Sequence, residues 1–430
     1  MLVEQKTAWK EATWIFGLSR LMILVFSYLS ATFLHMHRSI SPVNYIVLKK
    51  CSDNLNCFLL SWWRSDAIHY VEVAYLGYTH HMPLSVFFPL FPLLVHSLGG
   101  LLGGSILADY TAGIILANMC FYAVLVLFYQ LLYKDFGHTV AKYALIYLAF
   151  APYGLFFFAG YTESLFLLLS LAVFFFLQRG KALDWWLAGL CGFLAALTRA
   201  TGIVLLVPFF VLFVQRFGIH TGAMNWAPTI GNKLRKVVAS SSQFTINNSP
   251  IGRGPIDRAR WQQKLNALLS MALIPAGLLI YLLYLWITFG NPLVFHIEEA
   301  TVWQRYTAFP WVGSIDAIKG ILGLDRSFFS RDVADVTFTL VPLAVLVMGW
   351  KQLPLHYSLF SLAMVLFILC QPCEFEGLMS APRYLLVVFP IFLLFALWSK
   401  NRLTTWALMI FCLMFFVCNS IQFATSIWVA

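Results

Sequence analysis

The sequence predicts an all-α, polytopic membrane protein with about 11 transmembrane helices. Of its 430 residues, 61% are hydrophobic and only 11% are charged, whereas a soluble domain carries about 25% charged residues. Apolar stretches long enough to cross a bilayer recur along the chain, and they lack the period-2 alternation of a membrane β-barrel. The composition therefore excludes a soluble enzyme, a nucleic-acid-binding protein and a disordered regulator.

The apolar segments divide a single integral-membrane domain, 1–430, into successive spans. The first segment is too long for the core of a signal peptide and has no small-residue cleavage site after it, so we expect it to remain as a span. In order, the expected spans are 14–34, 109–132, 140–158, 163–178, 184–197, 202–215, 266–289, 336–350, 354–370, 383–398 and 403–425.

The segment 87–107 is apolar but is interrupted by prolines and glycines, among them Pro89, Pro92 and Gly99. Irregular backbone at membrane depth is tolerated only where protein or a cavity covers it. We therefore interpret this segment as re-entrant or interfacial, and not as a span.

The distribution of basic residues supports that interpretation. With a cytoplasmic N-terminus and 87–107 not crossing, 17 of the 28 Lys and Arg residues fall on the cytoplasmic side, as the positive-inside rule requires. The chain then has a first outer loop at 35–108, carrying interfacial or re-entrant helices. A basic cytoplasmic loop follows at 216–264, and a second large outer loop at 290–335.

Ionisable residues near the outer ends of the spans are the first candidates for a functional site, because such residues are costly at membrane depth. Asp66 and His69 stand three residues apart, on one face if the segment is a helix. Glu163 follows Thr162 at the start of an apolar run. A solvated loop acid and ordinary helix capping are the alternatives for Asp66 and Glu163.

Two arginines and a glutamine complete the candidates on the same face. Arg199 and Arg383, the latter followed by Tyr384, could bind a phosphate, and Arg199 could instead snorkel to the interface. Gln304 lies in the Trp-rich part of the second outer loop, where a substrate-binding role competes with an interfacial aromatic belt.

Together these residues suit chemistry on a lipid-linked anionic substrate. Guanidinium groups match the charge and geometry of a phosphodiester. A carboxylate can accept the proton of an attacking sugar hydroxyl, and such general-base catalysis typically contributes about 10²–10⁴-fold. Long apolar helices can hold a polyprenyl tail.

The same residues resemble the PIG-V family of GPI mannosyltransferase 2 enzymes. The resemblance covers most of the chain and is most specific between about 60 and 200. It is carried by Ser65-Asp66-Ala67-Ile68-His69-Tyr70 with Gly77-Tyr78, by Phe87-Phe88-Pro89-Leu90-Phe91-Pro92, by Tyr161-Thr162-Glu163-Ser164-Leu165-Phe166, by Thr198-Arg199 with Gly202, and by Pro382-Arg383-Tyr384. Two features depart from the family: Ser65 stands where Trp is usual, and the 290–335 loop is more like that of prokaryotic members.

The resemblance implies a C-type membrane glycosyltransferase that inverts the anomeric centre. The donor would be polyprenyl- or dolichyl-phosphate mannose. Asp66 would be the catalytic base, His69 a helper near the acceptor, and Glu163 a second polar group. Charge and sidedness make Arg199 and Arg383 the candidates for the donor phosphate.

We therefore expect a mannosyltransferase that acts at the extracytoplasmic or luminal face on a lipid-linked or glycan acceptor, in a bacterial membrane or, for a eukaryotic chain, the endoplasmic reticulum. No cofactor is required, although Glu163 leaves a divalent cation open. We expect membrane lipids and the lipid-linked substrates to be the partners, and we expect no binding of nucleic acid. The alternatives are a lipid or polysaccharide transporter or flippase, a non-catalytic scaffold, and a relative of protein O-mannosyltransferases.

Overall fold

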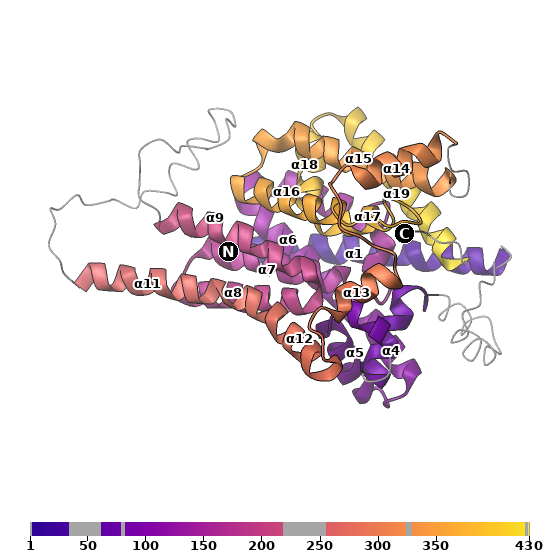
Figure 1. The fold of residues 1–430 in the computed structure, drawn as a ribbon. Helices are drawn as coiled ribbons and strands as arrows, with labels where there is room; N and C mark the ends of the chain where they lie inside the picture. The colour runs from indigo at the N-terminus through magenta and orange to yellow at the C-terminus, as the bar shows by residue number, and fades with distance from the viewer. Residues whose placement is uncertain are drawn as a thin grey trace.

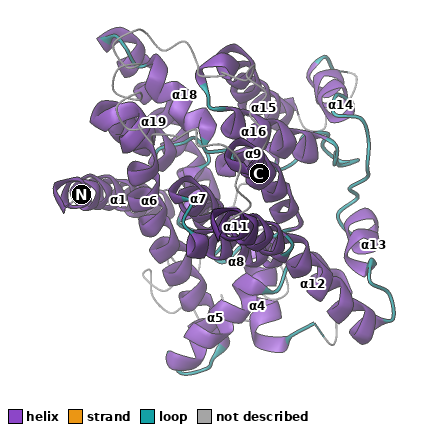
Figure 2. Cartoon of the chain, turned by 90° about the vertical axis from the view of Figure 1, so that its left-hand side faces the viewer, coloured by secondary structure: helices purple, strands orange, loops and turns teal. Residues whose placement is uncertain are grey.

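A computed structural model describes residues 2–33, 62–78, 82–217, 255–323, 329–425 and 429. Helices make up the regular structure of these residues, and the only β-type pairing among them is an isolated bridge between Arg305 and Cys373 (Figure 2). The expected all-α class is confirmed. Much of the first outer loop, most of the 216–264 loop, and residues 324–328 of the second outer loop lie outside the described residues.

The helices follow the order drawn in Figure 1. They are α1 (Leu2–Phe33), α4 (Asp66–Leu76), η1 (Met82–Val86), α5 (Leu90–Leu101), α6 (Ile106–Ala149), η2 (Gly154–Phe157), α7 (Glu163–Arg179), α8 (Ala182–Thr198), η3 (Ala200–Leu205), α9 (Leu206–Phe217), α11 (Pro255–Met271), α12 (Leu273–Phe289), α13 (Val294–Thr301), α14 (Val312–Ile321), α15 (Phe329–Gly349), η4 (Trp350–Gln352), α16 (Leu355–Leu369), α17 (Ala381–Tyr384), η5 (Leu385–Val387), α18 (Pro390–Trp398) and α19 (Arg402–Ala424).

Six helical segments of the described chain are long and apolar enough to cross a membrane. They are Gln5–Ser30, Ile106–Ala149, Ala200–Phe217, Trp261–Phe289, Asp332–Gln352 and Arg402–Ala424. A seventh would be the pair Ala381–Val387 and Pro390–Trp398, which bends by 80°. A count of eleven spans stays a prediction.

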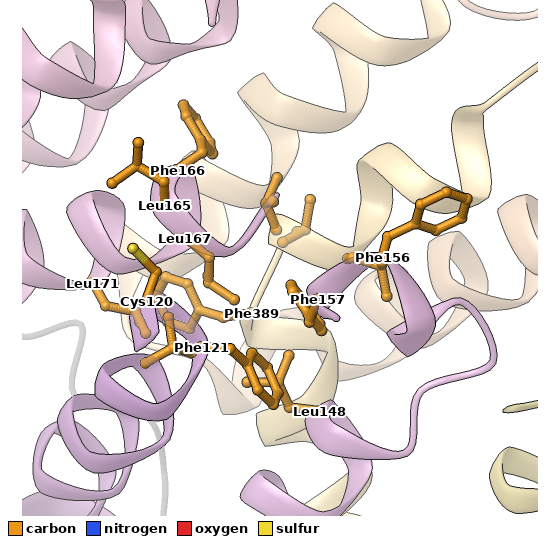
Figure 3. Packing of buried hydrophobic residues seen from close by; sticks show 14 of the residues in the cluster. Cys120, Phe121, Leu148, Phe156, Phe157, Leu165, Phe166, Leu167, Leu171 and Phe389 are labelled. Carbon is orange, nitrogen blue, oxygen red and sulfur yellow. The ribbon is translucent and has the colours of Figure 1, made fainter. Parts of the chain in front are cut away.

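The 44-residue helix α6 is a hairpin and not one straight rod. Gly137 within it has φ 79° and ψ 175°, which is not helical. The Tyr129 hydroxyl and His138 Nδ1 are 2.7 Å apart, although nine residues of straight helix would span about 13 Å. Phe121 and Phe157, beyond the end of α6, stack at 4.6 Å (Figure 3). The chain therefore reverses at Gly137, between the expected spans 109–132 and 140–158.

The apolar segment 87–107 of the first outer loop forms the short helix α5. Its 12 residues rise about 18 Å, which is less than a hydrocarbon core of about 30 Å. The chain turns at Gly103 and Gly104, both with positive φ, before α6 begins. The helix is thus too short to cross alone, in keeping with the re-entrant or interfacial interpretation.

Glycines allow α8 to pack closely against the end of α11 and against α12. A Cβ atom on Gly189 would lie 2.2 Å from the carbonyl oxygen of Ser270, and one on Gly277 would lie 2.4 Å from that of Phe193. Small residues at helix contacts are the usual means of close packing in membranes. These contacts hold α8 in place and thereby fix the turn at its end.

The two ends of α7 differ in chemistry. The helix begins at buried Glu163 and ends at Arg179, where Gly180 adopts a left-handed conformation beside Arg216. Its 17 residues rise about 25 Å. Figure 1 shows α9 and α11, which flank the 216–264 loop, on the left of the molecule, while α4 and α5 lie at its lower edge, right of centre.

Candidate active site

Asp66 is the first residue of α4, and the preceding turn is held firmly. Trp62 packs against Phe158 at 4.7 Å and Phe423 at 5.2 Å, and Arg64 donates a hydrogen bond to the Phe423 carbonyl. Ser65 has φ 47°, a conformation that disfavours large side chains. The turn places the Asp66 carboxylate at a helix N-terminus, which is a favourable position for an acid.

Four candidate side chains form one continuous network of ion pairs. Arg383 Nη1 lies 2.7 Å from Asp66 Oδ2, and Arg383 Nε lies 3.4 Å from Glu163 Oε1. Arg199 Nη1 donates to the same Glu163 oxygen at 3.0 Å. The structure therefore brings together residues from α4, α7, the end of α8 and α17 that are far apart in the sequence.

The network has a buried inner part and an outer part that faces a cavity. The side chains of Glu163 and Arg383 are 1% and 4% exposed, whereas those of Asp66 and Arg199 are 17% and 16% exposed. Glu163 is a buried charge that two guanidinium groups neutralise, and it does not line the cavity. Asp66 and Arg199 are the members best placed to meet a substrate.

The cavity has a volume of about 140 Å³. Its lining includes Asp66, Arg199, Arg383 and Tyr384, together with Glu299 and Trp303 from the second outer loop and its short helix α13. Charged groups and aromatic rings thus share one cavity.

Tyr384 organises the arginines of the site. Its ring centroid lies 4.6 Å from the guanidinium carbon of Arg199, 4.9 Å from that of Arg383 and 5.5 Å from that of Arg305. Its hydroxyl also accepts a hydrogen bond from Arg383 Nη2 at 3.1 Å. Cation–π contacts of this kind attract the guanidinium groups to one ring, so Tyr384 concentrates positive charge beside the cavity.

Two other predicted residues lie near the cavity without lining it. His69 Nδ1 is 3.3 Å from Glu72 Oε2, and its ring packs against Phe87 and Trp303. Gln304 has φ 50°, and its carbonyl accepts a hydrogen bond from the Glu374 backbone. The structure therefore brings Asp66, Arg199, Arg383 and Tyr384 to the cavity and leaves His69 and Gln304 beside it.

The sequence interpretation did not select Glu299 or Arg305, which both line the cavity. Arg305 donates from Nη1 to the Gln371 carbonyl at 3.1 Å and from Nη2 to the Met379 carbonyl at 3.0 Å, which fixes the loop. The sequence feature that could have identified them is the acidic pair Glu298 and Glu299, which lies close to a Trp-Gln-Arg sequence in an otherwise apolar chain.

Within the described residues, no group of three or more His, Cys, Asp and Glu side chains is arranged to hold a metal ion. Arg383 pairs with one oxygen of each carboxylate, Oδ2 of Asp66 and Oε1 of Glu163.

Comparisons with known proteins give structural likeness but no sequence family. No family model matches the chain, and no curated protein matches it. Two solved structures of the oligosaccharyltransferase of Archaeoglobus fulgidus resemble it, one with zinc and sulfate and one, named AglB, with an inhibitory peptide and a dolichol-phosphate. Each is 12% identical with a TM-score of 0.39, and the matches cover 78% and 94% of this chain but 44% and 55% of those transferases. The chain thus spans about half their length, and this likeness assigns it no activity.

Proposed function

We propose that this protein is a membrane glycosyltransferase that transfers a hexose, most specifically mannose, from a polyprenyl- or dolichyl-phosphate donor to a lipid-linked or glycan acceptor. The observation that carries the proposal is the cavity in which Asp66 and Arg199 face a common space. A proton acceptor and a phosphate-binding cation are thereby available at once. The choice of mannose rests on the PIG-V resemblance of the sequence.

The reaction is a single displacement with inversion. The acceptor hydroxyl oxygen forms a bond to the sugar C1 while the bond between C1 and the phosphate oxygen breaks. Asp66 takes the hydroxyl proton, and the electron pair of the broken bond leaves on the lipid phosphate. Since Oδ2 of Asp66 pairs with Arg383, Oδ1 is the oxygen that meets the acceptor.

The two arginines have different tasks in this mechanism. Arg383 contacts Asp66, Glu163 and the Tyr384 hydroxyl, so its charge is already compensated and it positions the base. Arg199 lines the cavity and pairs with Glu163 through Nη1. Arg199 is therefore the group that stabilises the charge of the departing phosphate, in the manner of electrostatic catalysis.

The membrane setting fits this chemistry. The site lies at the end of α7 opposite Arg179 and the beginning of the basic loop, which the positive-inside rule assigns to the cytoplasm. Transfer would then occur on the extracytoplasmic or luminal side, with the lipid tail between apolar helices. Arg199 supplies the charge that a lipid monophosphate leaving group needs, so the proposed mechanism requires no metal.

The test is a transfer assay with the purified full chain, polyprenyl-phosphate mannose as donor and a membrane-lipid extract as acceptor source. We expect mannose to appear on an acceptor with the anomeric configuration opposite to that in the donor. Retention of configuration would contradict the proposed displacement. Movement of the intact donor across vesicles without consumption would favour the flippase alternative.

A further inference from the structure

The short helix α13 forms a firm wall of the cavity. Val294 is buried, and the ring of Phe295 packs on that of Phe88 at 5.8 Å. The Arg305 backbone N–H donates to the Glu299 carbonyl at 3.0 Å, and the Arg305 guanidinium is itself held by two carbonyls of the 371–379 segment. The position of Glu299 is thus set by the same loop that closes the cavity.

The Glu299 carboxylate is a cavity group that the proposed reaction does not use. Burial raises its pKa above the ordinary value, while the nearby charges of Arg305, His296 and Arg199 oppose that shift and Asp66 adds to it. Among the described residues it forms no close ion pair of the kind that neutralises Asp66 and Glu163. It is therefore available to bind a ligand.

The surroundings of Glu299 suit hydroxyl groups on a sugar. A carboxylate accepts two hydrogen bonds from neighbouring hydroxyls, and hydrogen bonds to charged groups are stronger than neutral ones. The cavity-lining ring of Trp303, close along the chain, offers an apolar surface for the C–H groups of a pyranose. Arg199, Asp66 and Glu299 line the same cavity, so a sugar held there between phosphate and base would meet this carboxylate.

We infer that Glu299 is a specificity-determining residue that binds hydroxyl groups of the donor sugar, in the cavity that it lines together with Asp66 and Trp303. This inference rests on the proposed function, since it assumes a sugar-phosphate donor in the cavity. It differs from that function by assigning recognition of the sugar, as distinct from its phosphate, to the second outer loop.

The experiment compares binding of two lipids to the detergent-purified full chain: polyprenyl-phosphate mannose and polyprenyl phosphate without sugar. The variants are wild type, Glu299→Gln and the control Glu298→Gln, which changes the adjacent acid outside the cavity lining. We expect wild type and Glu298→Gln to bind the mannosylated lipid more tightly than the bare one. Glu299→Gln should reduce this preference about tenfold or more while leaving affinity for bare polyprenyl phosphate unchanged.

The outcomes separate the two claims. If Glu299→Gln keeps the wild-type preference for the mannosylated lipid, the assignment of Glu299 is wrong and the proposed function stands. If wild type binds neither lipid, the proposed donor is wrong and the inference falls with it. Equal loss of affinity for both lipids would show a merely structural role, and thermal unfolding of each variant checks that the fold is kept.

Discussion

Arg383 Nη1 lies 2.7 Å from Asp66 Oδ2, which joins a residue at the start of α4 to one in α17, more than three hundred positions later in the chain. The same guanidinium reaches Glu163. Because Arg383 is buried, the contact acts as a rigid support for the carboxylate that faces the cavity. Asp66 is therefore positioned by a partner that substrate does not have to displace.

Removing the positive charge of Arg383 should lower the stability of the folded protein as well as the rate of sugar transfer. Arg383→Gln leaves Asp66 and Glu163 without their shared partner, and breaking a buried pair typically costs about 3–5 kcal/mol. We expect a clear fall in the midpoint of thermal unfolding in detergent. The double variant Arg383→Gln/Glu163→Gln should recover part of the loss, because it also removes a buried charge. If the effects of the two single substitutions on the unfolding midpoint simply add in the double variant, Arg383 and Glu163 are not coupled, and the prediction is wrong.

Arg199 should affect the use of the donor more than the stability of the fold. Its side chain is partly exposed to the cavity, so Arg199→Gln should lower kcat/KM for the donor by about 10²-fold or more. Arg199→Lys should restore part of the loss by returning a charge without the planar geometry. The matched control is Arg179→Gln at the other end of α7, and equal losses in the two Gln variants would refute the assignment.

Gly202 should be required for the position of Arg199. A Cβ atom there would lie 2.4 Å from Ala196 N and 2.5 Å from Ala195 C, and these backbone atoms cannot yield without moving the end of α8. We expect Gly202→Ala to reduce transfer and lower the unfolding midpoint. Gly17→Ala, where no atom lies within 4 Å, is the control and should change neither quantity.

The raised pKa of Glu299 makes stability depend on pH. A carboxyl group whose pKa is higher in the folded than in the unfolded state holds its proton longer in the folded state. The contribution of Glu299 to folding stability is thus fully present when the pH is below its unfolded-state pKa, near 4.5. It is lost as the pH rises through the pKa of the folded state. Wild type should therefore lose more stability than Glu299→Gln when pH rises from about 4.5 to neutral. A midpoint difference between the two that does not change with pH would contradict this.

The sequence alone predicted the class of fold and several helix positions because apolar length is a local property. Glu163 does begin a helix, although the Thr162 side chain makes no capping hydrogen bond. Thr198 ends another helix, between the expected spans 184–197 and 202–215. The reversal at Gly137 agrees with the loop expected between two apolar segments. The 80° bend after Val387 was not predicted, since a break within a continuously apolar run leaves little mark on hydropathy.

The candidate site was predictable only in part. Charge at the outer ends of spans identified Asp66, Arg199 and Arg383, but their pairing depends on the packing of distant helices, which spacing does not encode. Glu299 was missed because it lies in a loop where a solvated acid is the ordinary interpretation. The role inferred for it depends on the Arg305 contacts with the 371–379 segment, and these exist only in the folded chain.

The central claim is that Asp66 accepts the proton of the acceptor. The most direct measurement is the rate of mannose transfer by Asp66→Asn beside wild type and Glu72→Gln, an acidic residue of the same helix that pairs with His69 away from the cavity lining. We predict a loss of about 10²–10⁴-fold for Asp66→Asn, with wild-type rates for Glu72→Gln and unfolding midpoints that show both variants folded. Transfer at the wild-type rate by folded Asp66→Asn would contradict the account.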